Sequence, residues 1–392
     1  MSGPFKRRPS LKKPPSIGLV KSPSRRRSSA ALLQPIPQSQ QEVPWDLLDR
    51  VLPLLFFCHG TALILSNILN LLRISQVTTF TLFIWFTIVT LGAVLFYHNL
   101  KVTVAGKAIL ITGCDSRIGS ALARYLDDLG FTVFAGFQNA ADNPLAQELK
   151  EESSGRLHVL QLDVSSETQI LAASLYAVEH LPDGAPGLWA VINAASWIAL
   201  GEIEWLPPQI IRKATELNFL GPTRLIQIML PLIRRARGRI VFMTSGLASV
   251  ASPVRGIHSA LLNAIEAEAS CLRQELRPRG VEVIVVAPGE YTAGSSWLSD
   301  DDIRDQAQEM WLQLCHEQRK SYGEDYFETA VRSLEKFTKG PEADLSPVLR
   351  SLTDSVVKTF PLPKYTPITR QEKIQSFIAN HLPQTLYNII YN

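Results

Sequence analysis

The pattern of apolar and polar positions divides the chain into an arm, two long apolar stretches and a region of short alternating elements. Residues 1–46 are rich in proline, serine, glutamine and basic side chains and show no apolar period, so we expect a disordered basic arm. Residues 47–100 contain two nearly uncharged apolar stretches, 51–72 and 77–97. Each stretch is long enough to cross a bilayer as a helix.

The link between the two stretches, residues 73–76, is so short that two crossing helices would form a hairpin. Nine Lys or Arg residues precede Glu42, the first acidic residue, and such a basic segment favours the cytosolic side of a membrane. We therefore predict that the main domain faces the cytosol. Two alternatives stay open: a single crossing by the second stretch, which would place the domain on the opposite side, and a buried hairpin of a soluble protein.

From Gly106 onward, short apolar runs alternate with segments whose apolar residues recur at helical spacing. The runs predict strands at 108–112, 132–135, 157–162, 189–193, 239–244 and 281–287. Nearly continuous apolar strands separated by helices indicate a parallel sheet covered on both faces. We predict a doubly wound α/β domain at 101–310, followed at 311–392 by a helical segment.

The charge and the cysteine content of the chain argue against two kinds of partner, nucleic acids and metal ions. The formal net charge is only +3 and the basic residues gather in the arm, so we expect no nucleic-acid partner. Four scattered cysteines form neither a disulfide framework nor a zinc motif, which predicts a reducing compartment and no metal site.

Candidate nucleotide chemistry begins at the end of the first strand. The run TGCDSRIG (112–119) leads into a helix, where a sheet of this kind holds a dinucleotide pyrophosphate against the helix N-terminus. Further features follow in order: LDV at 162–164, NAA at 193–195, Asn218 in a long helix, and Pro288-Gly289 after the sixth strand. Together they resemble the short-chain dehydrogenase/reductase superfamily over residues 106–392.

This resemblance implies a set of cofactor-binding residues. They are Gly113, Ile118 and Gly119 on the phosphate path, with Thr112, Asp115 and Arg117 in the same turn, Asp163 and Val164 at the adenine, Asn193 and Ala194 at the ribose, and Pro288 and Gly289 beside the nicotinamide. One departure is Arg117, which stands where the family pattern has its middle glycine. Its side chain could obstruct the pyrophosphate, which we favour, or offer its guanidinium to phosphate.

The segments YLDDLGFTVFAG (125–136) and YGEDYFE (322–328) look like the branch of membrane-bound retinol, 17β-hydroxysteroid and 3-hydroxybutyrate dehydrogenases. That branch implies a hydrophobic, steroid-like or retinoid-like alcohol or ketone as ligand, and NAD(H) in preference to NADP(H). It also implies that residues 311–392 cover the substrate or face the membrane. The implied membrane is that of the endoplasmic reticulum, with the mitochondrial membrane as the alternative. The superfamily implies a homodimer formed through the helices after the fourth and fifth strands.

The catalytic positions depart from the family. Ser245 occupies the serine position, but thirteen residues on the tyrosine position holds His258, and the lysine position holds Leu262. Without the lysine, no cation lowers the pKa of a proton-transferring group or binds the ribose. His258 could itself exchange the proton, with Ser245 polarising the oxygen and Asn218 holding a water. The alternative is that His258 is a half-buried, hydrogen-bonded helix residue and that the other two serve packing.

Two functions follow. The first is an NAD(P)-dependent oxidoreductase of a steroid, retinoid or other lipid alcohol, with His258 as substitute acid and base. The second is a non-catalytic relative that binds lipid or nucleotide or acts as a membrane scaffold. Mechanism favours the second, because two essential groups and a glycine of the phosphate loop are replaced together.

Overall fold

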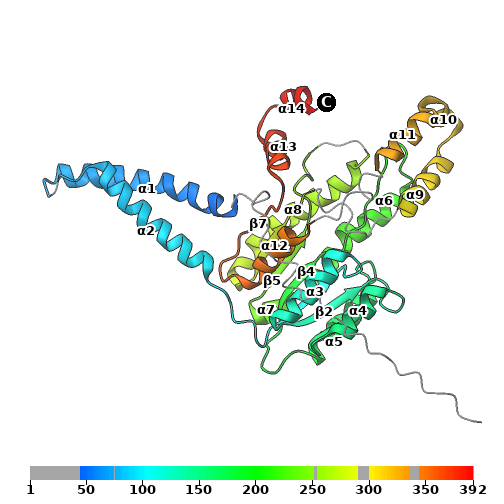
Figure 1. Ribbon diagram of the computed structural model, residues 1–392, viewed down its shortest axis with the longest axis horizontal. Coiled ribbons are helices and arrows are strands. Elements are labelled where there is room, and N and C mark those ends of the chain that lie inside the picture. The colour runs from blue at the N-terminus through cyan, green and yellow to red at the C-terminus, as the bar shows by residue number, and fades with distance from the viewer. Residues whose placement is uncertain (1–44, 75, 251–253, 290–299, 335–343, 392) are drawn as a thin grey trace, which may run out of the picture.

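The computed structural model describes residues 45–74, 76–250, 254–289, 300–334 and 344–391, so the predicted arm lies almost wholly outside the described residues. Its centre is a seven-stranded parallel sheet in the order β3-β2-β1-β4-β5-β6-β7 (Figure 1). The strands are β1 Ala108–Thr112, β2 Thr132–Phe137, β3 Leu157–Gln161, β4 Leu188–Asn193, β5 Arg239–Met243, β6 Glu282–Val286 and β7 Lys364–Tyr365. The predicted doubly wound α/β fold is confirmed.

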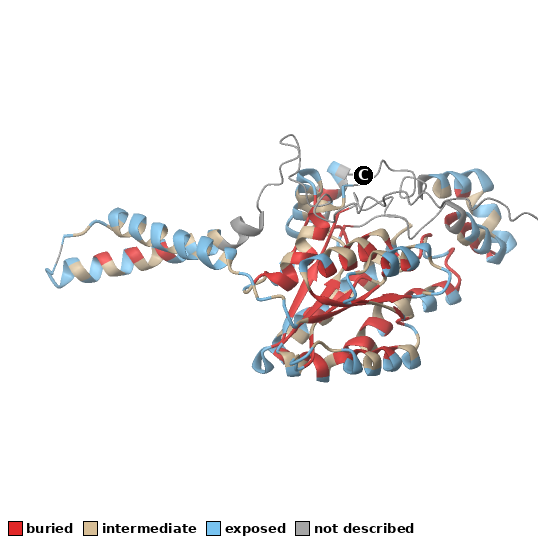
Figure 2. Ribbon diagram, turned by 60° about the horizontal axis from the view of Figure 1, so that its bottom comes forward, coloured by how far each residue is buried: buried red, intermediate tan, exposed pale blue. Residues whose placement is uncertain are grey.

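Helices cover both faces of this sheet. α3 (Arg117–Leu129), α4 (Pro144–Glu152) and α12 (Ser346–Val357) share one apolar cluster with the sheet. α5 (Glu167–Glu179), α7 (Gly221–Ala236) and α8 (Gly256–Leu276) share another. Alternate residues of β1 enter the two clusters, because successive side chains of a strand point to opposite faces. The sheet is therefore buried on both sides, as Figure 2 shows by the red strands between helices.

The strand order reverses next to β1, which pairs with β2 on one side and β4 on the other. Ligands of open α/β sheets bind outside the carboxyl ends of the strands at such a reversal. The register sets Thr112 opposite Asn193, the last residues of β1 and β4. The fold thus brings two predicted site residues side by side.

The long helix expected to contain Asn218 is divided into three pieces. α6 spans Pro208–Thr215, a π-helix spans Glu216–Leu220, and α7 begins at Gly221. A π-turn holds one residue more than an α-turn and is frequent at functional sites. The interruption falls on Asn218.

The C-terminal region contributes to the sheet domain, which the division at residue 310 did not anticipate. α12 packs against α3 and the sheet, and β7 pairs with β6 through Val285–Lys364 and Val286–Tyr365. A boundary at 310 therefore does not separate two structural units. The sequence did not predict β7 because the strand is two residues long and lies between prolines.

The remaining C-terminal helices lie over the carboxyl edge of the sheet (Figure 1). α9 (Asp300–Gln313), α10 (His316–Tyr322) and α11 (Glu324–Leu334) pack on α6 and the chain after β4. α13 (Arg370–His381) and α14 (Gln384–Tyr391) pack near the loop after β5. Whether these helices cover a substrate stays a prediction.

Two N-terminal helices, α1 (Trp45–Leu71) and α2 (Thr79–Asn99), project from the domain as a hairpin (Figures 1 and 2). Hydrogen bonds between side chains join them, from Ser66 to Thr79 at 2.7 Å and from Cys58 to Thr90 at 3.3 Å. By length and composition, Val51–Leu71 and Thr79–Asn99 are candidate membrane spans. Their surfaces are mostly exposed, and α2 has no buried residue.

Candidate functional site

The turn between β1 and α3 has the shape that a phosphate loop requires. Gly113 has a φ of +73°, and a Cβ atom there would lie 2.6 Å from the Cα of Ala195. A Cβ on Gly119 would collide with the carbonyl oxygen of Gly113. These contacts involve backbone atoms that cannot move aside, so both positions require glycine.

Ser116, which the sequence reading did not assign, fixes this turn. Its hydroxyl donates to the carbonyl oxygen of Gly113 at 2.8 Å and accepts from the Gly119 N–H at 3.1 Å. Ser116 is thus the N-cap of α3, and a serine directly before an apolar helical period was the available signal. The cap aims the start of α3 at the crevice, where the positive end of a helix dipole favours an anion.

Arg117 is the first residue of α3 and is half-buried. Its side chain therefore starts at the position where the phosphate path meets the helix. Ile118 beside it is buried in the core under the sheet. Whether the guanidinium obstructs a pyrophosphate or binds it stays a prediction.

Thr112 and Asn193 form a buried link between the first and fourth strands. The Thr112 hydroxyl donates to the side-chain oxygen of Asn193 at 3.0 Å and accepts from the Ala195 N–H at 3.3 Å. Ala194 is buried beside them. Asn193, predicted at the ribose, is thus held by Thr112 of the neighbouring strand.

The predicted adenine end is acidic. Asp115 accepts from the Gln138 N–H at 2.8 Å and from the Asn143 amide at 3.3 Å. The Gln138 amide donates to Asp163 at 3.4 Å. Val164 is buried next to Asp163. Two carboxylates therefore flank the residue that follows β2, and Gln138 and Asn143, which carry no charge, were missed as their partners.

Asn218 holds the chain after β4. Its side-chain oxygen accepts from the Trp197 N–H at 2.8 Å and from the Ser196 hydroxyl at 3.2 Å, and its amide donates to the Trp197 carbonyl at 2.6 Å. Asn218 is buried within the π-helix. These bonds occupy the side-chain oxygen and one of the two amide hydrogens, which fits the packing alternative and leaves one hydrogen to donate to a water.

Ser245 lies in the loop after β5, at the carboxyl edge of the sheet. Its hydroxyl oxygen accepts from the Leu247 N–H at 3.2 Å, a local turn contact. The hydroxyl hydrogen can still be donated to a ligand oxygen. Ser245 thus has a local packing role, and its catalytic role stays a prediction.

His258 and Leu262 lie one turn apart near the start of α8. Leu262 is 6% exposed and lies among the buried apolar residues. Nδ1 of His258 is buried and has no hydrogen-bond partner among the residues that the structure describes. The expected hydrogen bond from this nitrogen to a neighbour is therefore not found there. Burial, and secondly the charge of Arg255, lower the pKa of His258 to about 4. The imidazole is neutral at neutral pH.

Arg255 was missed by the sequence reading, although it stands three residues before His258 at the N-cap of α8. Residues at this spacing lie on one side of a helix. A guanidinium therefore stands near the altered proton-transfer position, while the position that would hold lysine is apolar.

The loop after β6 is joined to the C-terminal segment. The Gly246 N–H donates to the Pro288 carbonyl at 2.8 Å, and the Gly289 N–H donates to the Pro367 carbonyl at 3.2 Å. A Cβ on Gly289 would collide with the Glu372 carboxylate. Pro288 and Gly289 thus lie beside the Ser245 loop at the sheet edge, where the resemblance places the nicotinamide.

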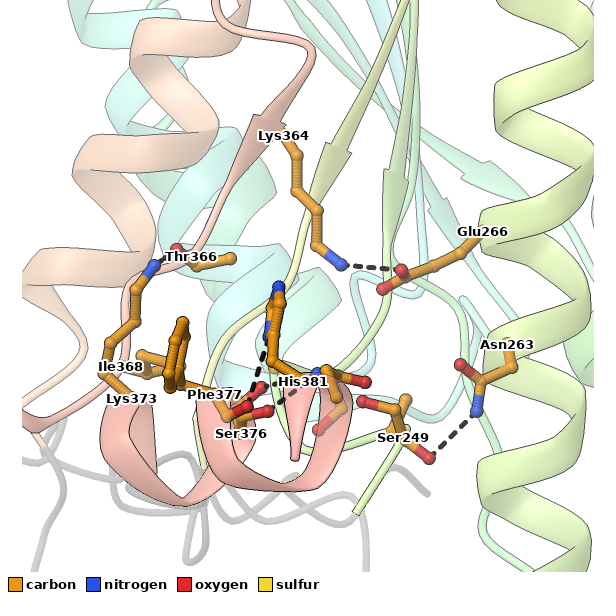
Figure 3. Close-up of a pocket in the computed structure, with 14 residues that line it drawn as sticks. Ser249, Asn263, Glu266, Lys364, Thr366, Ile368, Lys373, Ser376, Phe377 and His381 are labelled. Carbon is orange, nitrogen blue, oxygen red and sulfur yellow. Dashed lines mark hydrogen bonds and ion pairs between the residues drawn. The ribbon is translucent and has the colours of Figure 1, made fainter. Parts of the chain in front are cut away.

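A pocket of about 340 Å³ borders Ser245 on the side of α13 (Figure 3). Lys364 on β7 and Glu266 on α8 form an ion pair of 2.6 Å across it. His381 stacks on Phe377 at 4.5 Å. Most lining side chains are polar, and neither His258 nor Leu262 is among them. This pocket is therefore a polar space behind the serine and does not suit a steroid.

Apolar and aromatic side chains lie on the other flank of α8. Ile257 and Leu261, the neighbours of His258 and Leu262, pack with a cluster that includes Trp205, Trp311 and Phe327. This cluster belongs to the α9–α11 cover. A hydrophobic ligand would meet apolar groups on this flank.

The cover is tied down by two tyrosines. Tyr322 donates to Glu204 at 2.6 Å and Tyr326 donates to Glu202 at 2.7 Å. The hydrogen bond with Glu204 raises the pKa of Tyr322 to about 12. These hydroxyls hold the cover against the chain after β4.

Comparison with known proteins gives one family and a consistent group of relatives. The family described as short chain dehydrogenase matches residues 107–302. The mitochondrial D-beta-hydroxybutyrate dehydrogenase of Mus musculus is 34% identical over 288 residues, which are 73% of this chain and 84% of that protein. Estradiol 17-beta-dehydrogenase 2 of Mus musculus is 33% identical over 286 residues, which are 72% and 74% of the two chains.

Solved structures support the fold. A short chain dehydrogenase from Burkholderia cenocepacia, crystallised with NADP, superposes with a TM-score of 0.52 at 19% identity, covering 74% of this chain and all of that one. A short-chain dehydrogenase from Streptomyces avermitilis gives a TM-score of 0.55 at 18% identity, covering 73% and 96% of the two chains.

Proposed function

The chain belongs to the short-chain dehydrogenase family, and from this membership we propose that it is a membrane-tethered protein that binds NAD(H) and a hydrophobic alcohol or ketone with a severely slowed hydride transfer. The observation that carries the proposal is the pair His258 and Leu262. A neutral imidazole and an apolar side chain stand where the family places a tyrosine and a lysine.

The nucleotide half of the site supports binding. Gly113 and Gly119 allow close backbone approach, and the capped start of α3 favours an anion. Thr112 and Asn193 hold the strand ends at the ribose. When bound, the nicotinamide would supply or accept the hydride, and the protein residues would have to manage the proton.

The proton-transfer half does not support ordinary turnover. Ser245 can donate a hydrogen bond to a ligand oxygen. Leu262 cannot bind the ribose or lower a neighbouring pKa. His258, with a pKa of about 4, takes a proton less readily than a group poised near neutral pH. We infer that the site still binds the cofactor and the alcohol or ketone, but that hydride transfer is much slower than in a member with the tyrosine and lysine.

A second candidate is an oxidoreductase in which His258 is the acid and base. One observation favours it: the buried Nδ1 of His258 lacks a partner among the described residues. An unsatisfied buried nitrogen is costly and is typical of groups that meet a ligand or take part in chemistry. In this reading, His258 would exchange the proton directly and Ser245 would orient the oxygen.

The cofactor preference follows from charge. Asp115 and Asp163 flank Gln138 at the end of β2. Two carboxylates would repel a 2′-phosphate, and no basic side chain follows β2 directly to bind it. We therefore propose NAD(H) over NADP(H), with NADPH binding weaker by about ten-fold, since nearby like charges cost roughly 1 kcal/mol or more.

Ligand class and location rest on the relatives. Proteins named for estradiol, 11-beta-hydroxysteroid and D-beta-hydroxybutyrate dehydrogenation share about a third of their residues with this chain. We propose a lipid alcohol or ketone as ligand, and an endoplasmic reticulum membrane crossed by α1 and α2 with the domain in the cytosol. A mitochondrial membrane is the alternative. A homodimer through α7 and α8 completes the proposal.

The test compares binding and turnover in the full-length chain in detergent. NADH and NADPH fluorescence titrations measure binding, and NAD-linked oxidation of estradiol and of D-beta-hydroxybutyrate measures turnover. We expect saturable NADH binding and a slow rate that His258→Gln leaves unchanged. A rate that falls about 100-fold or more in His258→Gln, with NADH affinity unchanged, would establish the second candidate instead. Absence of NADH binding would remove both.

A further inference from the structure

An apolar groove of about 660 Å³ lies where the helical hairpin meets the sheet domain. Its walls are Pro53 and Leu54 on α1, residues 89–97 of α2, and residues 360–363 after α12. Apart from the hydroxyl groups of Thr90 and Tyr97, the side chains that line it are apolar. We call this space the junction groove.

The junction groove is held in shape by contacts between its walls. The Val102 N–H donates to the Val357 carbonyl at 2.8 Å, and the Thr359 N–H donates to the Leu100 carbonyl at 2.9 Å. The Tyr97 and Phe360 rings meet edge to face at 5.4 Å. The hairpin base is therefore bonded to the domain through backbone and ring contacts, so the groove has two fixed walls.

A band of charge lies at the domain end of the groove. Lys358 forms an ion pair with Asp354 at 2.8 Å and its ammonium lies 3.1 Å from Nε2 of His98. Lys101, paired in backbone register with Lys358, is exposed. Aromatic and basic side chains at the end of an apolar helix mark the level of lipid headgroups. The apolar walls then lie on the hydrocarbon side of this level.

We propose that the junction groove holds one acyl chain of a phospholipid from the leaflet beside the domain, an inference that rests on the proposed membrane insertion of α1 and α2. Two of its walls belong to the candidate membrane spans Val51–Leu71 and Thr79–Asn99, which expose mainly apolar side chains. A peptide in such a groove would leave backbone N–H and C=O groups without partners, whereas an acyl chain has none. Lys101 at the rim suits the phosphate of the same lipid.

The full-length chain in phosphatidylcholine vesicles tests this, with a fraction of the lipid carrying a photoactivatable diazirine on its acyl chain. After irradiation, labelled peptides are mapped by mass spectrometry. We expect labelling of residues 360–363, which lie outside both helices. Ala93→Trp and Leu54→Trp would each fill the groove from a different wall and lower that labelling several-fold. Ile84→Trp is the matched control, because Ile84 is an exposed residue of α2 outside the groove. This substitution should not change the labelling of residues 360–363.

The labelling pattern distinguishes failure of the acyl-chain site from failure of the membrane insertion of α1 and α2. Labelling of the helices without labelling of residues 360–363 would overturn the groove as an acyl-chain site and leave membrane insertion standing. Labelling of residues 360–363 that neither tryptophan variant lowers would overturn it as well. No labelling of either helix would overturn the membrane insertion itself.

Discussion

The glycine turn before α3 and the first turns of α8 face the same edge of the sheet, yet they have departed from the family to different degrees. At the turn, Gly113 and Gly119 are kept, and backbone atoms leave no room for a side chain at either. On α8, His258 and Leu262 replace both groups of the proton relay. The apolar replacement Leu262 is itself buried, at 6% exposure.

This difference shows which residues the fold itself protects. The glycines are required for packing whether or not a nucleotide binds, because a Cβ on Gly113 would strike the backbone of Ala195. A tyrosine and a lysine on α8 serve only the reaction and can be lost without cost to the core. Because packing alone would retain these glycines, an intact glycine turn is only weak support for nucleotide binding. Both the glycine turn and the first turns of α8 therefore need to be tested.

The largest expected effect comes from restoring the proton relay. His258→Tyr together with Leu262→Lys should raise NAD-linked turnover by about 10²–10⁴, the usual contribution of a positioned acid and base. The lysine would lie at a buried position, and the phenol and the bound ribose would have to satisfy it. Steady-state assays with estradiol and D-beta-hydroxybutyrate measure the change.

Leu262→Lys alone is the control, since it adds the cation without the phenol. It should give no gain in rate and should lower the unfolding temperature, because an unpaired buried ammonium is unfavourable. The double variant could stay folded and bind NADH without a gain in turnover rate. The obstruction to turnover would then lie outside α8, and Arg117 would be the first residue to test.

The next effect concerns the glycine turn. Gly113→Ala should weaken NADH binding by at least about ten-fold and lower the free energy of unfolding by roughly 1–3 kcal/mol, through a backbone collision and a positive φ. Gly184→Ala has a similar φ, +77°, but no atom within 4 Å of the added Cβ, so it isolates the conformational strain. Fluorescence titration and thermal unfolding of both variants separate the effects.

Equal NADH binding by Gly113→Ala and the original chain would mean that the turn is kept for packing alone. The nucleotide half would then be as altered in function as α8, and the contrast between the two regions would disappear.

The sequence predicted most of this architecture because its signals are local. Apolar runs marked six strands, and the run at 112–119 marked the turn into α3. The parallel order then brought Thr112 and Asn193 together, since both end neighbouring strands. The motif residues therefore fell near one edge of the sheet, as expected.

Features set by distant contacts were not predictable. β7 exists only because Lys364 and Tyr365 pair with β6, and no two-residue run signals a strand. The π-helix at Asn218 depends on bonds to Trp197 across the crevice. The pKa of His258 depends on its burial and on the nearby charge of Arg255, and the identity of residue 258 alone does not show either. Long-range packing decides such features.

The smallest expected effect is a pH dependence that reports on His258. Its pKa in the folded chain is about 4, below the value of about 6.5 for an exposed histidine, so the unfolded chain binds more protons between these values. The contribution of the neutral imidazole to stability is full above pH 6.5 and is lost as the pH falls toward 4, by roughly 1–3 kcal/mol. His258→Gln, which does not titrate, should lose less stability over this range.

Thermal unfolding of both proteins in detergent at several pH values measures the difference, and all other titrating groups cancel in the comparison. The pKa of His158 is also lowered by burial and by His180, but that histidine is present in both proteins. Parallel curves for the two proteins would mean that His258 is solvated and free to titrate near neutral pH. The proton-transfer side would then retain a competent base, and the oxidoreductase candidate would gain over the binding protein.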